Sequence, residues 1–171
     1  MKDILSEGLD RIKIGYVWAA LRIGLGWLLL WAFLDKLFGL GFATSADGAW
    51  INGGSPTTGF LKFGTSGIFS SFFESLAGNA AVDALFMAAL LLIGTALILG
   101  IGMKIATLSG AVLMFILYLS NVPPVNNPLI DEHIIYIIAL IGLAKVKAGQ
   151  WIGLGEWWSS TKLVKRFPIL E

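Results

Sequence analysis

Residues 14–34, IGYVWAALRIGLGWLLLWAFL, form an apolar run that Asp35 and Lys36 close. A run of about 20 apolar residues is long enough to cross a bilayer core of roughly 30 Å as a helix. It is also about twice as long as a signal-peptide core, so we expect it to remain as a membrane anchor. The chain is 57% hydrophobic and 13% charged. Since soluble domains carry about a quarter charged residues, this composition excludes an ordinary water-soluble globule.

Three further apolar blocks follow, and the four together predict an all-α integral membrane protein, a four-transmembrane-helix bundle. Two short helices are expected in the extracytoplasmic loop between spans one and two, where Ser55-Pro56 has the residue types of a helix start and residues 69–76 carry aromatic side chains at helical spacing. The chain is interpreted as one membrane domain with an interfacial helix (1–13), spans at 14–40, 82–101, 104–120 and 131–149, an outer loop (41–81) and a cytoplasmic amphipathic tail (150–171).

Lysines and arginines gather on one side of this arrangement. Nine of the 12 lie beside one set of helix ends, two lie beside the other set, and Arg22 lies within a span. By the positive-inside rule, both termini are expected in the cytoplasm, with the spans in a cell (plasma or inner) membrane and in contact with its lipid. The net charge of +1 gives no basic excess that would favour nucleic acid.

The scarcity of two residue types restricts the chemistry. The chain has no cysteine and one histidine. Disulfides, Cys-ligated iron–sulfur clusters and c-type haem attachment are therefore excluded, and a His-rich metal site cannot be built within one chain. Any redox reaction would need a bound organic cofactor, a quinone or a partner subunit.

Small residues recur at four-residue spacing inside the spans. In lipid, such pairs let helix backbones approach closely. We interpret them as packing positions, and they also permit a homodimer. The pairs are Ala20 with Gly24, Ala96 with Gly100 and Ala106 with Gly110.

Arg22 is the most costly residue of the spans. An arginine in a span costs roughly 3 kcal/mol or more unless it reaches the interface or finds partners. Backbone carbonyls, Thr95 and Ser109 are candidate neighbours, as are a lipid phosphate and a quinone carbonyl. A structural role and a ligand-binding role both stay open.

A belt of polar residues lies at the opposite helix ends from the basic side. Helix N-termini favour acidic residues, which accounts for part of the belt. It does not account for a histidine beside a carboxylate, an arrangement that transfers protons at neutral pH. The belt comprises Asp35, Lys36, Asp83, Tyr118, Asn121, Asp131, Glu132, His133 and Tyr136.

Four stretches of the chain resemble motifs of the DoxX family of small four-helix membrane proteins, which includes DoxD-like subunits. The resemblance covers most of the chain, and the motifs stand in the same order on the four spans. The stretches are LRIGLG (21–26) with the closing Asp35-Lys36, AWINGGSP (49–56), LILGIG (97–102) and DEHIIY (131–136).

The resemblance implies a subunit similar to that of thiosulfate:quinone oxidoreductase, which oxidises thiosulfate to tetrathionate and passes electrons to membrane quinone. It implies contacts with an anion or a quinone at Arg22 and Lys36, with Asp35, Trp50 and Glu132 as further ligand-binding candidates. Proton handling is assigned to Asp131, His133 and Tyr136 as catalytic candidates. A non-enzymatic membrane scaffold or assembly partner of a redox complex is the alternative, and a lipid or small-solute carrier is the third.

Overall fold

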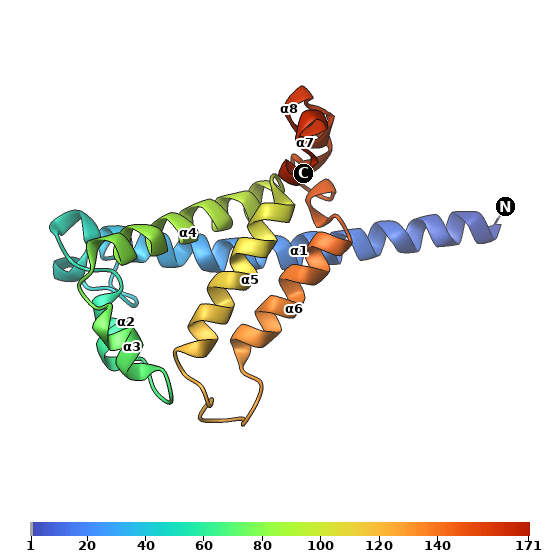
Figure 1. The fold of residues 1–171 in the computed structure, drawn as a ribbon. Coiled ribbons are helices and arrows are strands. Elements are labelled where there is room, and N and C mark those ends of the chain that lie inside the picture. The colour runs from blue at the N-terminus through green and yellow to red at the C-terminus, as the bar shows by residue number, and fades with distance from the viewer. Residues whose placement is uncertain (1) are drawn as a thin grey trace.

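The fold is described from a computed structural model that places the backbone of residues 2–171 and the side chains of residues 14–171. Over these residues the chain is 70% helical and contains no strand, which confirms the all-α expectation. Four long helices dominate it, and Figure 1 shows two antiparallel pairs, α1 with α4 and α5 with α6, with the second pair crossing the first at a steep angle. They are α1 (Lys2–Phe38), α4 (Ala80–Leu99), α5 (Met103–Leu119) and α6 (Glu132–Lys145).

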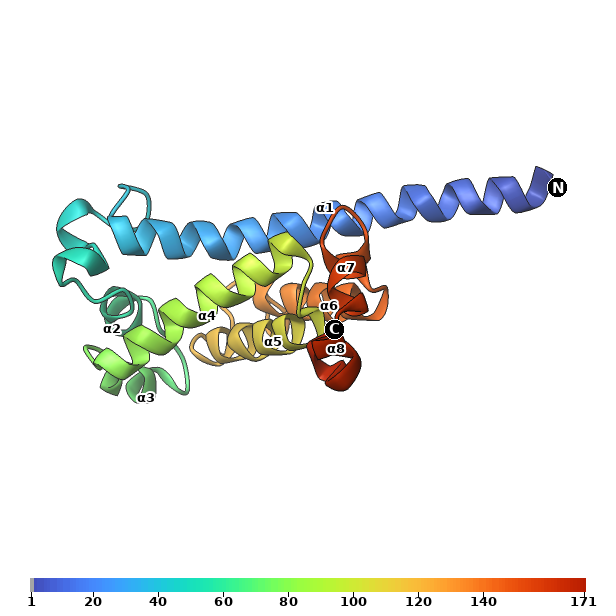
Figure 2. The same ribbon diagram turned by 90° about the horizontal axis from the view of Figure 1, so that it is seen from above.

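Helix α1 continues without a break from residue 2 into the first apolar run. The interfacial helix expected over residues 1–13 is thus the first part of α1. The amphipathic distribution of its side chains lies outside the described residues. Figure 2 shows this part of α1 extending past the other helices.

Two helices are long and apolar enough to cross a membrane, namely residues 14–38 of α1 and all of α4. Only 22% and 33% of the residues in their most apolar windows are buried within the protein. A core helix of a soluble protein would be mostly buried, whereas these helices leave Val17, Leu85 and Leu92 about two-thirds exposed or more. Their exposed apolar surface favours a membrane environment.

Helix α6 is shorter than the span predicted at 131–149, because it ends at Lys145. Lys147 then adopts a left-handed conformation with a φ of 51°. The chain leaves the helix so that Gly149 can lie against the α4–α5 turn, where an added Cβ would stand 2.3 Å from the Gly100 oxygen. The short helix η3 (Ala148–Gln150) forms here and contacts α1.

Gly26 of α1 and Gly94 of α4 lie against each other where the two helices cross. A Cβ added to either glycine would stand 3.0 Å from the carbonyl oxygen of the other. Of the predicted packing glycines, Gly110 lies against Leu140 of α6, whereas Gly24 has nothing within 4 Å of an added Cβ. Four-residue spacing therefore missed the glycine pair at the crossing, because it does not tell which helix face meets a neighbour.

The outer loop contains the two short helices expected from the sequence, α2 (Thr58–Phe63) and α3 (Ser70–Ser75), preceded by the turns η1 (Ala46–Gly48) and η2 (Trp50–Asn52). The linker between α2 and α3 is tied to the end of α5, since the amide of Ser66 donates to the Ser120 carbonyl and the amide of Ile68 to that of Val122. The loop therefore forms a fixed cover over one end of α4 and α5.

The tail returns to the opposite end of the helices through three short elements. Its last residue is held there by Lys104 at the start of α5, whose amide donates to the Glu171 carbonyl. The elements are α7 (Gly155–Ser160), α8 (Lys162–Arg166) and η4 (Pro168–Leu170).

Candidate functional site: a cavity under the outer loop

The Arg22 side chain is completely buried, and it binds backbone carbonyls. Its Nη1 donates to the carbonyls of Leu97 and Ile98, the latter at 2.9 Å. Its Nη2 donates to the carbonyls of Trp151 and Ile152, at 3.0 Å and 2.7 Å. The last carbonyls of a helix have no intrahelical partner, so the guanidinium caps the C-terminal end of α4 and fastens the tail to it.

This placement separates Arg22 from Lys36. The resemblance implied that both contact an anion or a quinone. They are 14 residues apart, which is about 21 Å along a helix. Arg22 lies at the tail end of the bundle, whereas Lys36 lies beneath the outer loop. Four carbonyls accept from Nη1 and Nη2 of Arg22, so its observed role is structural, while its buried Nε has no partner among the described residues.

The acidic residues of the polar belt accept hydrogen bonds locally. Asp35 is buried and accepts from the amides of Phe42 and Ala43, which fixes the turn after α1. Asp83 accepts from Ser55 and Thr57 and so holds the start of α2 against α4. Hydrogen bonds that hold the outer loop therefore account for these two members of the belt.

A cavity of about 300 Å³ lies beneath the outer loop. Its wall is apolar except for Lys36, Thr57, Ser120 and His133. The volume is at the lower end of the range typical of small-molecule sites, which are apolar cavities with a few polar groups. The apolar wall comes from α2, α3, α4, α5 and the loop, and comprises Pro56, Phe60, Leu61, Phe73, Leu76, Val82, Phe86, Leu113, Ile116 and Leu117.

Lys36 is the cationic group of this cavity. It is partly buried near the end of α1. Among the side chains that the structure describes, it makes neither a hydrogen bond nor an ion pair within the usual distance limits. An ammonium group that is removed from water costs free energy unless it finds a hydrogen-bond acceptor. A ligand oxygen in the cavity would supply such an acceptor.

His133 is the second polar anchor, and Asp131 orients it. The Nδ1 of His133 lies 2.8 Å from Oδ2 of Asp131, and the two side chains are 19% and 12% exposed. The other carboxylate oxygen of Asp131 accepts from the amides of His133 and Ile134, so the same residue caps the N-terminus of α6. The expected Asp–His pair is thus formed.

The remaining site candidates lie elsewhere. Tyr136 lies one turn further into α6, in the wall of a small apolar cavity with Leu25 and Met114. Trp50 packs against the core cluster of the helices. Glu132 is exposed on the outside of α6. None of the three is among the residues lining the cavity of Lys36 and His133.

The sequence did not identify the aromatic wall of the cavity. The helical spacing of aromatic residues in 69–76 did predict α3, and Phe73 of that helix is buried. Of the four spaced residues, only Phe73 and Leu76 line the cavity, so the spacing alone did not mark its wall. Among the described residues, no group of three or more histidine, aspartate and glutamate side chains could hold a metal ion.

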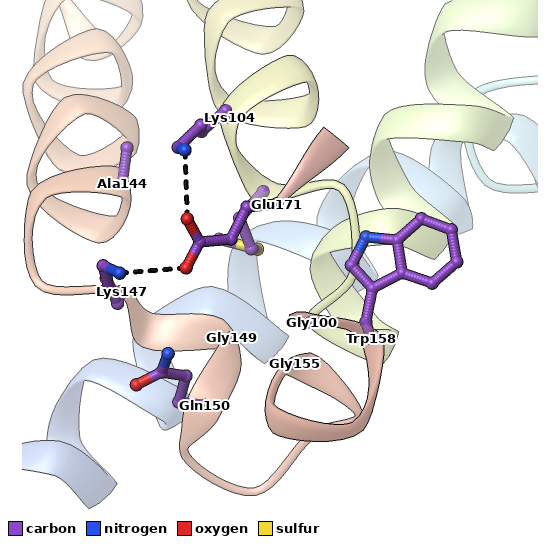
Figure 3. A pocket seen from close by; sticks show the side chains of 10 residues that line it. Gly100, Lys104, Ala144, Lys147, Gly149, Gln150, Gly155, Trp158 and Glu171 are labelled. Carbon is purple, nitrogen blue, oxygen red and sulfur yellow. Dashed lines mark hydrogen bonds and ion pairs between the residues drawn. The ribbon is translucent and has the colours of Figure 1, made fainter. Parts of the chain in front are cut away.

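At the other end of the long helices, the last residue of the chain forms a small ionic contact. Lys147 and Lys104 bind the two carboxylate oxygens of Glu171 at 2.9 Å and 3.0 Å, around a cavity of only about 50 Å³ (Figure 3). Hydrogen bonds from these two lysines hold the pKa of Glu171 below its ordinary value. The carboxylate is therefore ionised at neutral pH and holds the tail in place, and we assign no ligand to this cavity.

Comparisons of the chain with models of known protein families, with curated proteins and with solved structures found no match. The resemblance to the DoxX family therefore rests on the four quoted motifs. Of their residues, Lys36, Pro56 and His133 line the cavity under the outer loop, and Lys36 and His133 are its polar members.

Proposed function

We propose that the chain is a DoxX-like, quinone-binding subunit of a membrane oxidoreductase. The observation that carries this proposal is the presence of Lys36 and His133, two hydrogen-bonding side chains from different helices, in the wall of one largely apolar cavity. A quinone ring is flat and apolar with a carbonyl at each end, so two separated donors and an apolar wall suit it.

In this proposal the four long helices form a four-transmembrane-helix bundle in the plasma membrane, with both termini in the cytoplasm. The exposed apolar surface of α1 and α4 supports the two long spans. The distribution of lysines and arginines supports the orientation. Helices α5 and α6, at about 26 and 21 Å, are shorter than a typical bilayer core and require local thinning of the bilayer around them.

Reduction of a quinone to a quinol consumes two electrons and two protons. If thiosulfate is the donor, as the resemblance implies, two thiosulfate ions lose one electron each and join as tetrathionate. This chain offers no cysteine for a persulfide step, and Asp131 and Glu132 line, together with His133, a second cavity beside the first. Because these carboxylates repel an anion, we assign thiosulfate oxidation to a partner subunit and quinone reduction to this chain.

Binding of a short-chain quinone to the purified protein in nanodiscs tests the proposal. We expect Lys36→Met to weaken quinone binding at least ten-fold, because the variant removes the charged hydrogen bond to the quinone. Lys36 has no other described partner, so the substitution breaks no other contact. Lys62→Met is the matched control, since Lys62 is exposed on α2 at the same end of the protein. Titration by quenching of tryptophan fluorescence gives both affinities.

Two outcomes of this titration would contradict the proposal. One is that the quinone does not bind above the level seen with empty nanodiscs. The other is that Lys36→Met and Lys62→Met bind equally well.

A scaffold role is the second candidate, and it has an observation of its own. Large apolar side chains on the outer loop are strongly exposed, with Phe63 86% and Ile68 74% exposed. Such a surface fits a protein or lipid contact. A stable partner recovered in mild detergent, together with no quinone binding, would favour the scaffold over the oxidoreductase subunit.

A further inference from the structure

A second cavity, which we call the outer vestibule, lies beside the first. It has a volume of about 430 Å³ and is lined by side chains that include Asn121, Asn126, Asn127, Asp131 and Glu132. Three amides and two carboxylates make its wall far more polar than that of the first cavity. Such a wall holds water readily, because each group supplies hydrogen bonds.

His133 is the residue that the two cavities share, among those that line them in the described part of the chain. Its Nδ1 faces the carboxylate of Asp131, which itself lines the outer vestibule. Its Nε2 is therefore the ring nitrogen available to a ligand. Lys36 contributes a positive charge from α1, while Asp131 and Glu132 contribute negative charges from the start of α6.

We propose that His133 transfers protons between the outer vestibule and the apolar cavity, with Asp131 as the residue that positions it. This inference rests on the proposed function, because the reduced quinone oxygen is the acceptor. The imidazolium Nε2–H donates its proton to that oxygen, and vestibule water returns a proton to the vacated Nε2, while Nδ1–H stays bonded to Asp131. Two such cycles supply the two protons of one quinol, so these protons come from the outer side.

The two-sided position of His133 can be tested without a quinone. His133 is the only histidine of the chain, so protein labelled with ¹⁵N-histidine gives one pair of ring signals. We expect a water-soluble gadolinium chelate and a lipid-soluble nitroxide each to increase the relaxation of these signals at least three-fold. Relaxation by one agent alone would overturn the proposal, and this outcome does not depend on whether quinone binds.

Proton transfer is tested with an electron donor that carries no proton. Two reduced methyl viologen cations give two electrons to a bound quinone, so both protons must come from solvent through the protein. At saturating quinone, we expect His133→Gln to slow quinol formation at least ten-fold. Asp131→Asn, which keeps a good helix cap, should slow it about three-fold or more and change the ¹⁵N signal of Nδ1.

Glu74→Gln serves as the control, because Glu74 is exposed on α3 and lines neither cavity. It should form quinol within two-fold of the wild-type rate. Equal rates for wild type and His133→Gln would overturn the relay while leaving quinone binding intact. A failure of wild-type protein to bind quinone would instead contradict the proposed function. The relaxation experiment would still show whether His133 is accessible from both cavities.

Discussion

The Arg22→Met protein is expected to lose about 3 kcal/mol or more of folding free energy, seen as a large drop in melting temperature and in yield from mild detergent. Methionine fills much of the same space but donates no hydrogen bond. The carbonyls of Leu97, Ile98, Trp151 and Ile152 would then be left without the guanidinium that binds them. Each buried carbonyl without a donor costs about 1–3 kcal/mol, and local rearrangement recovers part of this sum.

The Arg22→Lys protein is the informative comparison. A lysine keeps the positive charge but has a single nitrogen, whereas the guanidinium reaches α4 with one nitrogen and the tail with the other. We expect its melting temperature to fall between those of wild type and Arg22→Met. A wild-type melting temperature for Arg22→Met would show that the carbonyl contacts do not hold the tail to α4.

Gly26→Leu is expected to separate α1 from α4. An added Cβ at this position would stand 2.9 Å from the backbone nitrogen of Ile98 and 3.0 Å from the carbonyl oxygen of Gly94. Backbone atoms of a helix cannot move aside singly, so a branched side chain must push the two helices apart. Overpacking of this kind costs about 1–3 kcal/mol of folding free energy in well-packed cores. Because the leucine would meet backbone atoms here, we expect a cost at or above the upper end of this range.

Gly24→Ala provides the matched control two residues away on the same helix. Nothing lies within 4 Å of its added Cβ, and alanine is the better helix former by about 1 kcal/mol. We therefore expect Gly24→Ala to melt at or slightly above the wild-type temperature. Thermal unfolding followed by size-exclusion chromatography measures both variants, and equal melting temperatures for them would contradict the close crossing.

The sequence predicted the helices well because their signals are local. The apolar runs, the Ser55-Pro56 helix start and the aromatic spacing in residues 69–76 act within a few residues. Where the prediction of α6 ran too long, the reason is a tertiary contact, since the chain leaves the helix to place Gly149 against Gly100. Local patterns carry no information about such a contact.

The candidate site was predicted only in part for the same physical reason. Helical periodicity placed Arg22 and Lys36 on one stripe, but it did not tell which neighbour each residue meets along the helix axis. The carbonyls that bind Arg22 come from residues 75 to 130 positions away in the chain. By contrast, the pair of Asp131 and His133 was predictable, because the two residues are neighbours at a helix start.

The central claim is that a quinone occupies the cavity of Lys36 and His133, and labelling with a photoreactive quinone tests it most directly. After illumination of the protein in nanodiscs, mass spectrometry locates the modified residues. We predict labelling on α2 and α3, at wall residues such as Phe60 and Phe73, and its suppression by excess unreactive quinone. Labelling confined to the lipid-facing surface of α4, unaffected by that excess, would contradict the claim.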